Sequence, residues 1–378
     1  MDHKALFPRS PSRRPRRSAG ERRFNTILTV VMGLFGAGWS WGIAVAAESG
    51  TSTDAAERLT ANPFDPGAAP EAAFLMDALV RSFADVDELR GISGDVRVVL
   101  TEPGEPMRLA LPDSLPPEVV TELRPMRGTV VDLAAPGHPV RDSLAVAPAG
   151  SGVWALTLRA PDGQVTEVPD VRVIVQVPSS RRLKGAIGAY NVGEWPFEKK
   201  KAPQAIYATP RGLVEVTLEN MTMPISEHFL LGDFLTKGQA ETWPKYVVMS
   251  SRLLDKLELT IQQLEADGHA VNDVGIISGF RTPYYNAHGG NTEGRGSLSR
   301  HMYGDAMDFY IDNDGDKSMD DLNGDGKVDV GDARVIAAAA EQVEKDHPSL
   351  IGGIGIYRPT GAHRGFVHLD TRGFRARW

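Results

Sequence analysis

Cysteine is absent from the 378 residues of this chain. Its absence excludes disulfide bonds, thiolate metal sites, a cysteine nucleophile and a lipoprotein cysteine anchor. Any zinc site must therefore use His, Asp or Glu side chains. Negative charge predominates beyond the first 23 residues: this head carries +6 and the whole chain −8, so the remainder carries −14. This charge argues against nucleic acid or anionic lipid as the main partner of the remainder.

An apolar segment without charges follows the basic head. Residues 24–47 contain no charged side chain, and small residues stand at Ala44 and Ala46. This pattern predicts, within residues 1–47, either a cleaved secretory signal peptide or an inner-membrane anchor at residues 26–47. In both cases the rest of the chain is expected in the periplasm or another extracytoplasmic space. Contact with a membrane is expected only through this segment.

Composition divides the remainder into a linker, two domains and a connector. Residues 48–90 form a polar linker that ends in one short helix. Residues 91–185 hold short runs rich in Val and Leu between Pro, Gly and Asp turns, which predicts an all-β sandwich of immunoglobulin-like type. Residues 186–224 are a Gly-, Pro- and aromatic-rich connector with one strand, LVEVTLE.

The last part, residues 225–378, contains seven of the nine histidines. An amphipathic helix is expected in VVMSSRLLDKLELTIQQLEADG, with its end at Gly268. Four strand candidates follow, namely DVGIISGF, AMDFYI, GGIGIY and FVHLDT, and a helix in DARVIAAAAEQVEKD separates the second from the third. This order predicts an α+β domain with an antiparallel sheet, and the chemistry is expected here.

Strand periodicity directs three polar side chains to one place. In AMDFYI, Asp308 points away from the apolar residues, and in FVHLDT the same holds for His368. If the two strands pair, both side chains converge on one polar face. His301 stands just before the first of them, where the chain can curl its imidazole back. Two imidazoles and one carboxylate, with a position left open, are the ligands of a catalytic zinc site.

The motifs SGFRTPYYN, SRHMYGDAMD, GIGIY and GFVHLDTRG, in this order, resemble the zinc D-alanyl-D-alanine carboxypeptidases of bacterial cell walls. These enzymes are related to the lysostaphin and hedgehog zinc domains. The resemblance covers residues 225–378 and implies a zinc metallopeptidase that hydrolyses peptidoglycan stem peptides, either as a carboxypeptidase or as an endopeptidase. It implies His301, Asp308 and His368 as zinc ligands, and Arg281 as the residue that holds the substrate carboxylate or the developing oxyanion. Ser299 is expected to hydrogen-bond the peptide.

One position departs from this group, whose members usually carry a general base beside the last ligand as His-x-His or Glu-x-x-His. Here Phe366 and a glycine stand at those two positions. His363, Asp370 and Asp305 are the candidates to replace the base, and Asp370 can instead orient His368. A non-catalytic zinc protein of the cell envelope that binds peptidoglycan is the alternative function.

An acidic stretch after the AMDFYI strand indicates a calcium-type loop inserted at residues 312–332. Gly326 stands where such a loop turns sharply, and a helix follows, as in dockerin-type loops. A solvated acidic turn is the alternative. The expected calcium ligands are Asp321, Asn323, Asp325, the carbonyl of Lys327, Asp329 and Asp332. The expected role of the ion is structural.

Overall fold

The computed structural model describes residues 97–109, 118–127, 137–140, 144–200, 202, 204–290, 292, 295–360 and 364–378. The predicted signal or anchor at 26–47 and the linker at 48–90 lie outside these residues. In the part of the chain that is described, no helix is both long and apolar enough to cross a membrane. The domain boundaries expected from the sequence stay predictions.

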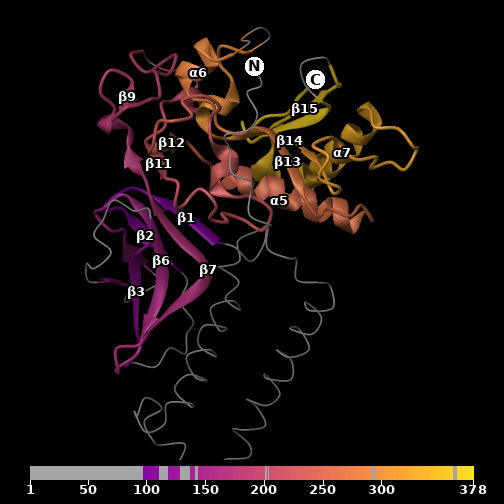
Figure 1. Cartoon of the computed structure of the whole chain (residues 1–378). Helices are drawn as coiled ribbons and strands as arrows, with labels where there is room; N and C mark the ends of the chain where they lie inside the picture. The colour runs from indigo at the N-terminus through magenta and orange to yellow at the C-terminus, as the bar shows by residue number, and fades with distance from the viewer. Residues whose placement is uncertain are drawn as a thin grey trace, which may run out of the picture. The chain divides into compact units, whose positions relative to one another are not determined.

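The first described region is organised around one five-stranded sheet with the order β1-β7-β6-β3-β4 (Figure 1). Strand β1 runs parallel to β7, and the other neighbours are antiparallel. Strands β2 and β5 form a separate two-stranded ribbon. The bounds are β1 Arg97–Thr101, β2 Pro106–Arg108, β3 Val120–Pro125, β4 His138–Pro139, β5 Leu144–Val146, β6 Gly152–Arg159 and β7 Val165–Val175.

The described residues of this region form strands and turns, as expected for an all-β region. Its arrangement as an immunoglobulin-like sandwich stays a prediction. Of the predicted strands, GTVVDLA lies outside the described residues. Strand β3 was not predicted, because its sequence VTELRP mixes charged residues with proline. It is nevertheless central, since Leu123 lies opposite Leu156 of β6 and both side chains are fully buried.

Short elements fill the stretch between this sheet and the C-terminal region. Strand β11 pairs with β12 and β8 in a three-stranded antiparallel sheet, and it is the strand expected in LVEVTLE. The bounds are β8 Val177–Pro178, η2 Ser179–Arg181, β9 Ala186–Ile187, β10 Tyr190–Asn191, η3 Ala205–Tyr207, β11 Gly212–Val216, η4 Leu231–Phe234 and β12 Lys245–Val247.

The C-terminal region contains a second five-stranded sheet with the order β13-β14-β16-β15-β17 (Figure 1). The four predicted strands are β13 to β16, and the two predicted helices are α5 and α7. The sheet is not wholly antiparallel as expected, because the edge strand β17 runs parallel to β15. The bounds are α5 Ser251–Ala266, β13 Val274–Ser278, α6 Pro283–His288, η5 Arg300–Tyr303, β14 Ala306–Ile311, α7 Val330–Asp346, η6 Pro348–Leu350, β15 Gly353–Tyr357, β16 Phe366–Asp370 and β17 Ala376–Arg377.

Helix α5 ends as the sequence predicts, at a glycine. Gly268 has a φ of +91°, which costs glycine no steric strain. This turn lets the N–H of Gly268 reach the carbonyl of Glu265, and the N–H of His269 reach that of Leu264. The two bonds form a Schellman motif, which satisfies carbonyl groups at the end of the helix.

The core of this region holds the two central strands in place. Helices α5 and α7, both labelled in Figure 1, pack against each other, and both contact β16. Leu257 and Ile261 of α5 are fully buried together with Met307 and Phe309 of β14. A truncation such as Leu257→Ala is expected to cost about 2–5 kcal/mol of folding free energy. Because one face of β14 is fixed by this core, side chains on its other face take defined positions.

Candidate metal centre

Asp308 and His368 lie directly opposite each other on the paired strands β14 and β16. Directly opposed residues of an antiparallel pair project to the same face of the sheet. The pairing expected from the strand periodicity is therefore confirmed. Both side chains are nevertheless buried, at 3% and 6% exposure, so the polar face of the sheet is covered rather than open to solvent.

His301 reaches the same place from η5, the single helical turn before β14. Gly304 ends this turn with a φ of +69°, and a Cβ at its position would lie 2.3 Å from the carbonyl oxygen of Val248. A glycine is thus required for the chain to turn from η5 into β14. The carbonyl of His301 accepts the N–H of Arg281, which anchors the turn to the segment after β13.

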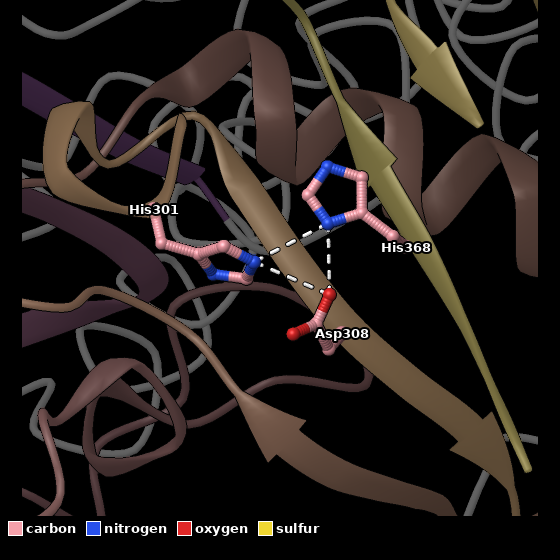
Figure 2. A group of neighbouring side chains, drawn as sticks. All are labelled: His301, Asp308 and His368. Atoms are coloured by element: carbon pink, nitrogen blue, oxygen red, sulfur yellow. Dashed lines mark hydrogen bonds and ion pairs between the residues drawn. The ribbon is translucent and has the colours of Figure 1, made fainter. Parts of the chain in front are cut away.

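Three donor atoms of these residues converge, as Figure 2 shows. Asp308 Oδ1 lies 2.8 Å from His368 Nδ1 and 3.2 Å from His301 Nε2. The two ring nitrogens are 3.2 Å apart. Tetrahedral zinc with ligand bonds of about 2.0–2.1 Å separates its ligand atoms by about 3.3 Å. The three atoms therefore need to move apart by only a few tenths of an ångström to share one zinc ion.

The outward nitrogens of both rings have acceptors that fix the ring orientation. His301 Nδ1 lies 2.7 Å from the carbonyl oxygen of Gly279, and His368 Nε2 lies 3.0 Å from Asp370 Oδ2. When each outward nitrogen donates its hydrogen, the inward nitrogens present lone pairs to Asp308 Oδ1. Two lone pairs and a carboxylate oxygen at this separation repel one another unless a cation lies between them.

The charges at the centre agree with a cation site. Burial is the main influence on the pKa of His301 and lowers it, so this ring is neutral. Burial alone would raise the pKa of Asp308, but His301 and His368 hold that pKa well below its ordinary value. For His368, burial is outweighed by the hydrogen bonds to Asp308 and Asp370, and its pKa is raised. A metal ion that binds here would displace this proton.

Arg281 forms an ion pair with the second oxygen of Asp308. Its Nη2 lies 2.7 Å from Asp308 Oδ2, and its Nε donates to Ser278 Oγ at 2.8 Å. Ser278 was missed by the sequence analysis, although it stands in the same SGFRT motif and lies opposite Asp308 in the β13–β14 pairing. The guanidinium thus supports a proposed metal ligand, and with 18% of its side chain exposed it also reaches the surface.

Two of the three candidate bases are engaged elsewhere. Both oxygens of Asp370 accept hydrogens from Arg372, and the carboxylate lies on the side of His368 that faces away from Asp308. Asp305 forms a two-bond ion pair with Arg300. This geometry argues against both as the base, and it gives Asp370 the orienting position that the sequence left open. The third candidate, His363, lies outside the described residues.

Other residues of interest lie at the rim. Ser299 is the residue before η5, and its hydroxyl makes no capping hydrogen bond there. Its contact with the peptide stays a prediction. Phe366 is buried on β16 and stacks on Tyr357 of β15. The indole of Trp378 lies beside the ring of His368, with ring centroids 5.1 Å apart. Tyr357 and Trp378 were missed, because only the strand order β16-β15-β17 brings them here.

In the acidic stretch, several carboxylates accept hydrogen bonds from backbone N–H groups of the same stretch. Asp321 accepts N–H groups of the turn that follows it, and Asp332 accepts the N–H of Asp329. Asp329 and Asp332 together form a capping box at the start of α7. Apart from the metal centre, the described acidic side chains near enough to share a cation are those of Asp312, Asp314 and Asp316. The structure thus adds no support for calcium at the six predicted positions, and that site stays a prediction.

Comparison with known proteins finds a family similarity in the segment that holds the first two motifs. Residues 244–331 match a family model described as peptidoglycan L,D-endopeptidase MepK (Peptidase_M15_2). No curated protein and no solved structure matches the chain. The matched segment includes Arg281, His301 and Asp308, whereas His368 lies beyond its end and joins the site through the pairing of β14 with β16. The resemblance seen in the motifs is thereby confirmed: the C-terminal region is similar to the zinc-dependent metallopeptidases that hydrolyse peptidoglycan.

Proposed function

We propose that the C-terminal region is a zinc-dependent endopeptidase that hydrolyses a bond between an L- and a D-configured residue of peptidoglycan. The convergence of His301, Asp308 and His368 carries this proposal, because three such donors leave one zinc position for water or substrate. The family similarity at residues 244–331 favours the L,D-endopeptidase over the D-Ala-D-Ala carboxypeptidase that the motifs also allowed. Peptidoglycan as substrate places this region outside the cytoplasm.

The side chains around the centre prepare it for hydrolysis. Zinc bound here would polarise the scissile carbonyl and lower the pKa of a bound water. The carbonyl of Gly279 and the carboxylate of Asp370 hold the two imidazoles with their lone pairs inward. Arg281 balances the charge of Asp308 and keeps its second oxygen turned away from the other two donors.

Arg281 is also proposed to bind the substrate. Its Nε and Nη2 contact Ser278 and Asp308, and a guanidinium has five N–H donors, so three remain for other acceptors. A carboxylate or carbonyl oxygen of the peptide fits these donors, because a guanidinium stays charged in the folded protein. The same residue would then link the metal ligand to the position of the peptide.

The general base is proposed to be His363. Asp370 and Asp305 are committed to ion pairs with Arg372 and Arg300. His363 stands between β15 and β16 in the sequence and precedes the strand that carries His368, and an imidazole has an ordinary pKa close to neutral pH.

A non-catalytic peptidoglycan-binding protein is the second candidate function. The observation that favours it is Phe366, which stands where the related enzymes carry a histidine and which stacks on Tyr357 instead of presenting a base. Such a protein would keep the metal and bind wall peptides without cutting them.

Mass spectrometry of muropeptides separates these two functions. The full-length chain, loaded with zinc, is incubated with purified muropeptides, and new products are identified by mass. Cleavage between an L- and a D-residue, lost in Asp308→Ala, supports the endopeptidase. As a matched control, His269→Ala removes a histidine at the end of α5 and is expected to leave cleavage unchanged. Binding of muropeptides without any new product would establish the non-catalytic function instead.

A further inference from the structure

The polar face of the C-terminal sheet continues beyond the metal centre onto β15. Asp308 lies opposite His368, and on the other side of β16 the residues opposite His368 and Phe366 are Gly355 and Tyr357. Because opposed residues share a face, Tyr357 projects to the same face as the two proposed metal ligands. Tyr357 thus lies on the strand next to β16, opposite Phe366, two residues along from the pair of Gly355 and His368.

Gly355 leaves room on this face for an aromatic side chain from the edge strand. A Cβ at Gly355 would lie 2.4 Å from Cε2 and 2.5 Å from Nε1 of Trp378. The indole therefore occupies the space above Gly355, beside the ring of His368. Backbone hydrogen bonds to Ile354 and Ile356 of β15 hold Trp378 there.

Trp378 fixes the hydroxyl of Tyr357. Its Nε1–H donates to Tyr357 Oη at 2.8 Å. An indole N–H is only a donor, so this bond uses a lone pair of the phenol oxygen and does not involve the phenol hydrogen. The Tyr357 ring is held at the same time by Phe366, with centroids 4.4 Å apart and planes 9° from parallel. The phenol thus has a fixed ring and a fixed oxygen at the edge of the metal centre.

The hydroxyl also lies within electrostatic reach of the centre. Burial is the main cause that raises the pKa of Tyr357, and the charges of Asp308 and Arg281 act on that pKa in opposite directions. The phenol is therefore neutral at neutral pH and is a hydrogen-bond donor, not a base. A donor held beside a zinc site is suited to bind an oxygen that gains negative charge.

We propose that Tyr357 is a catalytic residue of this peptidase, which donates a hydrogen bond to the scissile carbonyl oxygen as that oxygen becomes an oxyanion. Trp378 is its positioning residue. The inference rests on the function proposed above and names a residue for it. Phe366, which cannot act as the base at its position, has instead the role of supporting the Tyr357 ring.

The reaction balances without a proton from Tyr357. Attack of water forms a C–O bond and moves the carbonyl π electrons onto oxygen, where the phenolic hydrogen stabilises them. When these electrons return, the C–N bond breaks, and the amine leaves with a proton from the attacking water. Tyr357 ends the cycle as it began it.

The test compares Tyr357→Phe with the wild-type full-length chain. Removal of one oxyanion donor typically lowers kcat about 10²- to 10³-fold. We expect a fall of this size with little change in KM, because the hydrogen bond strengthens only in the transition state. Zinc content and Tm should stay at wild-type values, since phenylalanine keeps the ring that stacks on Phe366. Tyr310→Phe is the matched control, because its ring covers Gly275 of β13, on the other side of β14 from β16.

Two further measurements make the result decisive. Trp378→Phe keeps an aromatic ring above Gly355 but removes part of the indole and its donor to Tyr357, and the loss of one such bond should lower kcat about fivefold. A phosphinate pseudopeptide with an L- and a D-alanyl residue mimics the oxyanion, and calorimetry should show it bound about 10²-fold more weakly by Tyr357→Phe. Wild-type turnover in Tyr357→Phe would overturn the role of Tyr357 and leave the endopeptidase intact.

The experiments also distinguish a failure of the proposed function from a failure of the role of Tyr357. If the wild-type chain cleaves no muropeptide, the endopeptidase is overturned, and the phosphinate affinities then decide the role of Tyr357 alone. Equal affinity for wild type and Tyr357→Phe, or no binding by either, would overturn it. Weaker binding by Tyr357→Phe would keep it as an oxyanion donor.

Discussion

Replacement of Asp370 by asparagine is expected to weaken zinc binding about 10- to 100-fold, although Asp370 is not a proposed metal ligand. Its carboxylate is fully buried and accepts from His368 Nε2 at 3.0 Å. This bond directs the other nitrogen of the ring toward Asp308. The same carboxylate accepts the N–H of Gly353 at 2.8 Å and the guanidinium of Arg372 through Nε at 2.9 and 3.0 Å.

The size of the effect follows from the number of donors that meet this carboxylate. Asparagine offers one acceptor oxygen, and its NH₂ group would face a donor of His368, Arg372 or Gly353. His368 and Arg372 hold the pKa of Asp370 well below its ordinary value although burial opposes this, so the native group is ionised and the amide removes a charge. A 10- to 100-fold loss corresponds to about 1.4–2.8 kcal/mol of zinc-binding free energy.

Competition with a chromogenic zinc chelator measures the zinc Kd of each variant. Asp267→Asn is the matched control, because this carboxylate at the end of α5 is exposed and accepts a hydrogen bond from the side chain of Gln263. We expect a wild-type Kd for the control and a raised Kd for Asp370→Asn. If Asp370→Asn folds, as judged by its near-UV circular dichroism, and binds zinc with the wild-type Kd, then Asp370 does not orient His368.

Three further changes test other parts of the region. In His301→Ala/His368→Ala, stoichiometric zinc should be lost by elemental analysis, and zinc retained at one ion per chain would refute the ligand set. Lys256→Met removes the buried ammonium that lies 2.6 Å from Glu344, which keeps its ion pair with Arg377, so urea unfolding should show a loss of about 1–3 kcal/mol, and an unchanged midpoint would contradict this. Arg281→Lys keeps the charge but not the planar fork, so muropeptide cleavage should fall about 10²-fold with zinc retained; full activity would remove Arg281 from the substrate site.

Periodicity and local signals in the sequence determined which elements form in the C-terminal region. The alternation of AMDFYI and FVHLDT placed Asp308 and His368 on polar faces, because side chains of a strand alternate by steric necessity. Gly268 marked the end of α5, because a left-handed backbone at that position favours glycine. These features depend on a few neighbouring residues, so the chain encodes them without reference to the rest of the fold.

Only the tertiary structure decided the partners of each polar group. The sequence implied a substrate role for Arg281, and the pairing of β13 with β14 places it against Asp308 as well. Asp370 was a candidate base, and Arg372 and Gly353 engage its carboxylate from outside its own strand. A hydrogen-bond partner is set by what lies within about 3 Å, and residue spacing along a chain does not state that distance.

The tertiary structure also decided the surroundings of the aromatic residues and the partners of the acidic stretch. Because β15 lies between β16 and β17, Tyr357 and Trp378 come to the edge of the metal centre, although the motif GIGIY gave Tyr357 no role in the site. Asp329 and Asp332, which fit a calcium loop by their spacing, form the capping box of α7 in the structure. A carboxylate binds whichever donors the fold brings to it, backbone N–H groups included, so its residue type specifies its chemistry but not its partner.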